Sequence, residues 1–216
     1  MTNRLTLDDI ADLRAYERER DEFRNRVIAL KRKRRVSVGP HITFVFENAD
    51  TIRFQIQEMA RAERMLSDEA IQDELDTYNE LIPGPGELSA TMFLELTNKQ
   101  ELEEWLPKLV GIETAVQLHL GADPAAGGKD SAAAGKDSGA QVVRCEVDPA
   151  HAAALTREET TASVHYVRFK LTAAEIERFA KGPVALVIDH RHYKERHELS
   201  DATKESLLQD LRPSTR

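Results

Sequence analysis

The sequence has one cysteine, Cys145, among 216 residues. It therefore cannot form a disulfide within the chain, and it cannot supply a multi-cysteine zinc or iron–sulfur site. No uninterrupted apolar run approaches the roughly 18 residues that a membrane-spanning helix needs. Met1 to Leu30 also lack the apolar core and small-residue cleavage motif of a signal peptide. We expect a cytoplasmic protein in which Cys145 is a buried core thiol.

Motifs of several common enzyme classes are missing as well. There is no Gly-x-Ser-x-Gly nucleophile motif, and the Gly-rich segment 121–140 lacks the Gly-Lys-Ser/Thr ending of a phosphate-binding loop. The formal net charge of −8 argues against bulk binding to nucleic acid or to anionic membranes. Whether the protein is an enzyme stays open at this point.

One stretch departs from the acidic balance, because five basic residues follow one another near the end of a predicted helix. One explanation is structural, because positive charges are favourable at the negative, C-terminal end of the helix dipole. The alternative is that the run binds an anion or an acidic partner protein. The run has no interleaved aromatic residues, so nucleic acid is an unfavourable partner. The five residues are Lys31, Arg32, Lys33, Arg34 and Arg35.

The first half of the chain reads mainly as helices. Thr6 and Asp9 resemble a capping box, and apolar residues then recur at spacings of three, four and seven as far as Leu30. This pattern predicts a long amphipathic helix within residues 1–35. Residues 36–97 predict a β-hairpin that turns at Gly39-Pro40, a short antiparallel helix pair and a strand.

The second half contains two strand–helix–strand units, at 90–120 and 169–188, which predict two helices packed on one face of a shared sheet. Between them, residues 121–140 contain 5 Gly and 7 Ala and predict a disordered insertion. Residues 141–216 predict the second half of the sheet and a C-terminal helix. The fold class expected for residues 1–216 is a single α+β domain. Its mixed, mostly antiparallel sheet has about six strands, with helices packed on it.

A carboxylate interrupts the apolar face of the helix that follows Phe46. At about 100° per residue, Glu63 projects within roughly 20° of the mean direction of Ile52 and Ile56 on this face. A buried carboxylate needs a cation, a metal ion or a proton. An ion pair with Arg20 or Arg24 of the first helix is one solution, and a metal ion is another. The apolar residues of this face are Ile52, Ile56, Met59 and Leu66.

Two histidines follow the apolar strand Val184–Ile188, at positions 190 and 192. In an extended chain they point the same way, so both imidazoles can bind one divalent metal ion. With Glu63 they complete a two-histidine, one-carboxylate set for non-haem iron, zinc or manganese. The alternative is that both histidines cap the strand and bond to neighbouring carboxylates. The candidate ligands are His190, His192 and Glu63, with Glu58, Glu95 and His165 as weaker ones; supporting residues are Tyr78, Asn79, Asp189 and Tyr193.

Several motifs resemble a bacterial family of similar length that is classified as a domain of unknown function. They are Phe46-Glu47-Asn48, Gln55-Ile56-Gln57-Glu58-Met59, Tyr78-Asn79-Glu80-Leu81-Ile82-Pro83, and Val187-Ile188-Asp189-His190 with Tyr193. Members of this family are often encoded beside rubrerythrin-like and iron–sulfur oxidoreductase proteins. The resemblance thus implies an accessory protein of iron or redox metabolism whose partner is a redox protein. Whether the chain also associates with itself stays open. The alternative is a non-catalytic interaction module that docks through its N-terminal helix and basic segment.

Overall fold

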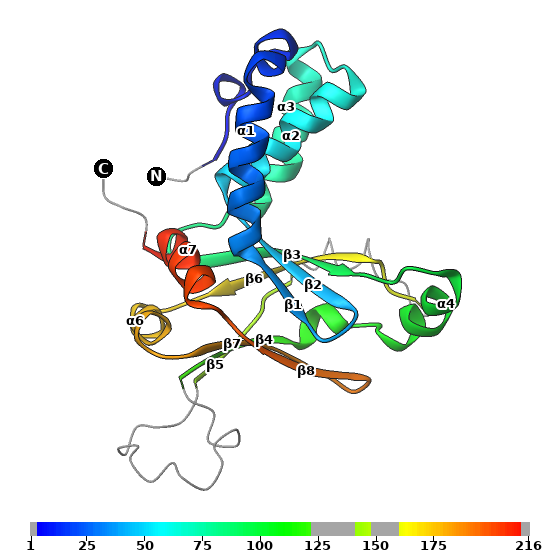
Figure 1. Cartoon of the computed structure of the whole chain (residues 1–216), viewed down its shortest axis with the longest axis vertical. Coiled ribbons are helices and arrows are strands. Elements are labelled where there is room, and N and C mark those ends of the chain that lie inside the picture. Colours follow the sequence, from blue (N-terminus) through cyan, green and yellow to red (C-terminus); the bar gives the residue numbers. More distant parts are fainter. Residues whose placement is uncertain (1–3, 122–140, 148–159, 213–216) are drawn as a thin grey trace, which may run out of the picture.

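Two four-stranded antiparallel sheets pack face to face and form a sandwich (Figure 1). The computed structural model describes residues 4–121, 141–147 and 160–212. The first sheet has the order β1 (Arg35–Val38), β2 (Ile42–Glu47), β3 (Glu87–Leu94) and β6 (Val164–Lys170). The second has the order β5 (Gln141–Arg144), β4 (Val116–Leu120), β7 (Val184–His190) and β8 (Tyr193–Glu198). The predicted disordered insertion, residues 121–140, lies outside the described part of the chain except for Gly121.

The main hydrophobic core lies between the two sheets. Alternate residues of each strand point inward, so that Phe44, Met92 and Phe169 of the first sheet are fully buried with Leu118 and Leu186 of the second. Each such side chain contributes roughly 1.5–3 kcal/mol by leaving water. The predicted hairpin is confirmed, since β1 and β2 pair in register from Arg35 with Val45 to Val38 with Ile42.

The prediction of one mixed sheet of about six strands is wrong in its details, although the α+β class is confirmed. All strand pairs in the described ranges are antiparallel, and the eight strands divide into two sheets. Both strand–helix–strand units cross from the first sheet to the second. Their helices, α4 (Lys99–Lys108) and α6 (Ala173–Lys181), therefore lie at opposite ends of the sandwich and not on one face (Figure 1).

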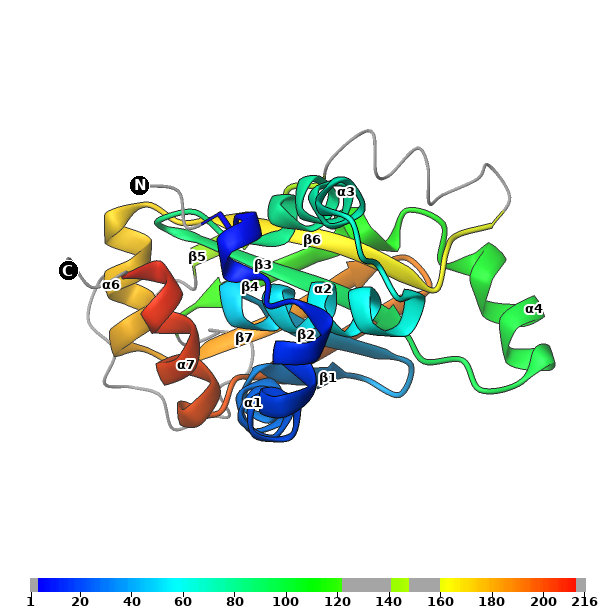
Figure 2. The same cartoon turned by 90° about the horizontal axis from the view of Figure 1, so that it is seen from above.

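Three helices project from the sandwich as an arm: α1 (Leu13–Arg34), α2 (Ala49–Glu63) and α3 (Asp68–Tyr78). Figure 2 shows them nearly end-on. The long amphipathic helix is confirmed, with Tyr16, Phe23 and Val27 buried. Its start differs from the prediction, because the Thr6–Asp9 capping box opens the short helix η1 (Leu7–Asp9), and Asp12 caps α1.

The helix pair α2 and α3 is confirmed, but the apolar face of α2 is shorter than predicted. Ile52 and Ile56 are fully buried, whereas Leu66 is 86% exposed. The helix stops at Glu63 because Arg64 adopts a left-handed conformation with φ 54°. Glu63 lies in the last turn of the helix, is exposed to solvent, and needs no buried counter-charge.

Three further helical segments complete the description of these ranges. Helix α7 (Asp201–Leu211) packs Leu207 and Leu211 against the main core, and the short helices η2 (Asn79–Leu81) and η3 (Ile112–Ala115) precede β3 and β4. Among the described residues, no helix combines the length and the apolar character that crossing a membrane would require.

Candidate functional site

The two histidines predicted as a metal pair lie at a tight hairpin turn, one at the end of a strand and one within the turn. His190 ends β7 and pairs with Tyr193, which begins β8, so the chain reverses at Arg191 and His192. His190 is 9% exposed, its Nε2 lies 3.2 Å from the Val110 carbonyl oxygen, and its Nδ1 accepts a hydrogen bond from the His192 backbone N–H at 3.4 Å. His192 is exposed. The turn thus removes the extended geometry on which the prediction depended.

The weaker ligand Glu58 is held inside the arm. The guanidinium of Arg20 donates two hydrogen bonds to its carboxylate, each 2.8 Å long, and the Tyr16 hydroxyl donates a third at 2.6 Å. The hydrogen bond from Arg20 is the largest cause of the lowered pKa of Glu58, although burial opposes it. The ion pair expected between Arg20 and Glu63 is therefore formed with Glu58, because position 58 faces α1 and position 63 does not.

The other predicted carboxylates form pairs at the surface. Glu95 lies 3.3 Å from a guanidinium nitrogen of Arg35, and Asp189 lies 3.0 Å from the Lys194 ammonium. Exposed pairs of this kind contribute little, typically below about 1 kcal/mol. Both carboxylates therefore have a cation beside them at the surface.

The remaining supporting residues have structural contacts. The Asn79 side chain accepts the Leu5 backbone N–H at 2.8 Å and donates to the Leu5 carbonyl at 2.9 Å, which holds the N-terminal segment against the arm. The buried Tyr193 hydroxyl donates to the Val38 carbonyl at 2.7 Å and accepts the His41 backbone N–H at 3.1 Å. Tyr78 is half-buried and packs against the cluster around Ile52.

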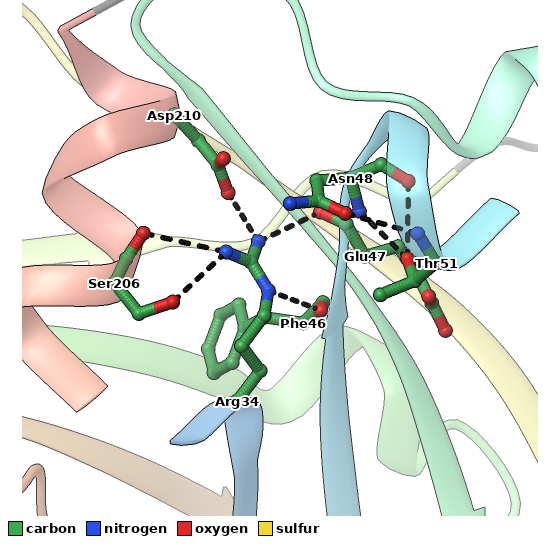
Figure 3. A network of polar contacts seen from close by, with 7 residues as sticks. All are labelled: Arg34, Phe46, Glu47, Asn48, Thr51, Ser206 and Asp210. Carbon is green, nitrogen blue, oxygen red and sulfur yellow. Dashed lines mark hydrogen bonds and ion pairs between the residues drawn. The ribbon is translucent and has the colours of Figure 1, made fainter. Parts of the chain in front are cut away.

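The basic run does not form one anion site, because its members face different environments. Arg34 is 1% exposed and lies at the base of the arm (Figure 3). Its guanidinium donates to the carbonyl oxygens of Phe46 and Glu47 at 2.8 and 3.0 Å. It also binds Ser206 and the carboxylate of Asp210 on α7. Of the other members, Arg35 pairs with Glu95, Lys31 lies 6.0 Å from the Phe54 ring centroid, and Arg32 and Lys33 are exposed.

The structure brings the predicted residue His165 to a carboxylate that sequence reasoning missed, Glu113 of η3. Their side chains are almost fully buried, and His165 Nδ1 lies 3.9 Å from Glu113 Oε2. On the other side of the ring, Nε2 lies 3.0 Å from the Ala162 carbonyl oxygen and 2.9 Å from the Thr161 hydroxyl. A carbonyl oxygen only accepts, so Nε2 carries a proton.

The electrostatics of this pair are unusual. Burial lowers the pKa of His165, although the charge of Glu113 and the hydrogen bond to Ala162 oppose the shift. In the neutral ring with Nε2 protonated, the lone pair of Nδ1 faces a carboxylate oxygen. Two acceptors in this arrangement repel unless a proton or a cation lies between them. The pair can therefore hold a proton or a metal ion.

Two more titratable groups lie near this pair. His190 is buried, and this burial is the main cause of its lowered pKa. The negative charge of Glu113 acts in the opposite direction and raises the pKa of His190. The Cys145 thiol lies 3.0 Å from the Glu113 carbonyl oxygen, and burial raises the pKa of Cys145 to about 11. At neutral pH this thiol is protonated. Cys145 is half-buried and packs against the main core, so the prediction of a fully buried thiol is met only in part.

Glu113 was difficult to recognise from sequence. The signal present was an acidic residue set among apolar ones in Leu109-Val110-Gly111-Ile112-Glu113, directly before a predicted strand. In the described part of the chain, no three His, Cys, Asp or Glu side chains converge closely enough to form a metal-binding group. His165 and Glu113 thus supply two donors.

These features define an α+β protein with two antiparallel sheets, a helical arm and a buried imidazole–carboxylate pair. The chain belongs to the family described as Protein of unknown function (DUF3501), whose profile matches residues 4–211. It is similar to a protein of unknown function from Burkholderia pseudomallei K96243, seen in a crystal structure at 1.90 Å resolution. The sequence identity is 33% and the TM-score 0.81, over 98% of this chain and 100% of that one. A search of curated proteins found no match.

Proposed function

We propose that this protein is an accessory protein of iron or redox metabolism that binds one non-haem metal ion, iron, zinc or manganese, between His165 and Glu113. The assignment to iron or redox metabolism rests on what the family resemblance implies. The position of the ion follows from one observation, the 3.9 Å approach of Nδ1 to Oε2 in the protein interior. No third side-chain ligand is proposed, because no three His, Cys, Asp or Glu side chains converge in the described ranges, and both ring nitrogens of His190 are engaged by the Val110 carbonyl and the His192 backbone N–H.

Two details of the pair support a metal ion. Metal–nitrogen and metal–oxygen bonds in zinc sites are each about 2.0–2.2 Å, so one ion can reach both atoms when they are about 4 Å apart. In addition, a metal-binding histidine commonly donates its other ring N–H to a carbonyl or a carboxylate, which fixes the ring. His165 does this through Nε2 and the Ala162 carbonyl.

Metal analysis tests this proposal. We expect about one equivalent of iron, zinc or manganese per chain in protein purified without a histidine tag. Glu113→Gln keeps the shape of the side chain and removes its charge, so we expect at least a tenfold loss of metal affinity. His192→Ala, an exposed histidine in the turn, is the matched control and should keep the metal. A folded wild-type protein that binds none of the three metals after incubation with each would refute the proposal.

A second candidate function is a non-catalytic interaction module, which the projecting arm favours (Figure 1). Helix α1 carries nine Lys and Arg against four Asp and Glu, although the chain has a net charge of −8. Arg14, Arg18 and Arg32 lie exposed on one side of it. Such a face suits a partner protein with an acidic surface. The family resemblance suggests a rubrerythrin-like protein.

Binding of a purified rubrerythrin-like protein tests this second function. We expect association at low salt that weakens at least tenfold when Arg14, Arg18 and Arg32 are all changed to Glu. Lys99→Glu, on the exposed surface of α4, is the matched control and should leave binding unchanged. Deletion of residues 1–35 is unsuitable, because it removes the buried Tyr16. If the wild-type protein does not associate, docking to this class of partner is wrong.

A further inference from the structure

Glu47, the last residue of β2, has a buried carboxylate that the protein satisfies only in part. The residue is 3% exposed. Its Oε1 accepts a hydrogen bond from the Thr91 hydroxyl at 2.8 Å, whereas its buried Oε2 has no hydrogen-bond partner among the described residues. An ionised carboxylate placed in this way is costly without a positive partner.

The carboxylate lies on the face of the first sheet against which the arm packs. Strand pairing puts Glu47 opposite Ser89, and puts Thr91 opposite both Val45 and Tyr166. Side chains at directly paired positions share a sheet face. Ser89 and Thr91 are buried, and Tyr166 packs against the apolar cluster of the arm. The uncharged polar groups on this face near Glu47 are thus hydroxyls, whose donor atoms are oxygen.

Two arginines that the fold brings to this region, Arg34 and Arg168, are engaged elsewhere. Arg34 donates to the main-chain carbonyl of Glu47, and the Glu47 carboxylate points away from the guanidinium (Figure 3). Arg168, which pairs with Ser89 across the sheet, binds the Glu87 carboxylate at 2.6 Å and the Glu80 carbonyl. Neither guanidinium is placed to neutralise Oε2.

We propose that Glu47, Ser89 and Thr91 form a binding site for a monovalent hard cation, Na⁺ or K⁺, beneath the arm. Oxygen donors prefer hard cations to the softer transition metals. One positive charge balances the single carboxylate, whereas a divalent ion would leave an excess charge in the interior. The ion stabilises the packing of the arm on the sandwich, and its site is separate from the His165–Glu113 pair.

Thermal unfolding at constant ionic strength tests this site. We compare the chloride salts of sodium, potassium and choline, because the bulky choline ion cannot approach a carboxylate that is 3% exposed. Binding to the folded state alone raises Tm, and for a chain of this size we expect a rise of about 2–4 °C in NaCl or KCl over choline chloride. Equal Tm values in the three salts would overturn the proposal.

Two variants locate the effect. Glu47→Gln removes the charge with little change in shape, so we expect it to abolish the difference between the salts. Glu95→Gln is the matched control, because Glu95 is an exposed carboxylate that follows β3 and pairs with Arg35, and it should keep the difference. If Glu47→Gln fails to fold, Ser89→Ala is the second variant, because it keeps the carboxylate. It should at least halve the difference in Tm between NaCl or KCl and choline chloride. A folded Glu47 or Ser89 variant with the full wild-type difference would contradict the proposal.

Discussion

Arg34→Ala is expected to lower the free energy of unfolding by about 3–5 kcal/mol, since truncating one partner of a buried ion pair leaves the other charge uncompensated. The partner here is Asp210, which is 12% exposed. The variant also leaves the carbonyls of Phe46 and Glu47 without their donors. Because Arg34 joins α1, the end of β2 and α7, the loss acts where the arm meets the sandwich (Figure 3). Urea unfolding followed by circular dichroism measures the effect.

Two other variants show whether the burial of Arg34 causes this loss. Arg34→Lys keeps a positive charge but cannot reproduce the fork of hydrogen bonds, so it should recover only part of the stability. Arg32→Ala removes an exposed arginine from the same basic run and should change stability by less than about 0.5 kcal/mol. If Arg32→Ala and Arg34→Ala lower the free energy of unfolding by similar amounts, the contacts of Arg34 between the arm and the sandwich do not stabilise the protein as we describe.

Phe44→Ala is expected to lower the free energy of unfolding by about 3–5 kcal/mol, the usual range for a large core side chain. Phe44 is fully buried between the two sheets and lies opposite Met92 on the neighbouring strand. Its removal leaves a cavity that sheets fixed by hydrogen bonds on both sides cannot easily close. In a chain of this size the expected fall in Tm is at least about 6 °C, measured by calorimetry.

Leu66→Ala is the control for this prediction. The apolar pattern of its helix predicted that Leu66 lies in the core, yet the residue is 86% exposed. Its truncation should therefore change the free energy of unfolding by less than about 0.5 kcal/mol. A loss above about 2 kcal/mol would mean that Leu66 packs against another surface.

The sequence predicted those features that depend on neighbouring residues. The long helix, the hairpin at Gly39-Pro40 and the α2–α3 pair follow from local periodicity and from turn residues, and all three are present. The pattern of apolar residues could not predict how the strands divide into sheets. Strands such as Val184–His190 are buried on both sides, so their side chains do not reveal which neighbour covers which side.

The candidate site was predicted only in part, for the same reason. Local reasoning picked His165 from its place on an apolar strand face, and it picked His190 and His192 by assuming that the strand continues. The chain turns at Arg191 and His192, so that pair does not lie on one extended strand, and Glu113 comes within 3.9 Å of His165 only because η3 packs against β6. A contact between residues 52 positions apart leaves no local periodicity.

The sequence alone therefore determined the α+β class, the amphipathic helices and which residues are titratable. The tertiary structure decided which charges are buried and with what partner. Among five consecutive basic residues it placed Arg34 in the interior, and among the acidic residues it buried Glu47 and Glu113 while leaving Glu63 in water. Burial depends on what packs over a residue from distant segments, and the energy of a charge depends chiefly on that burial.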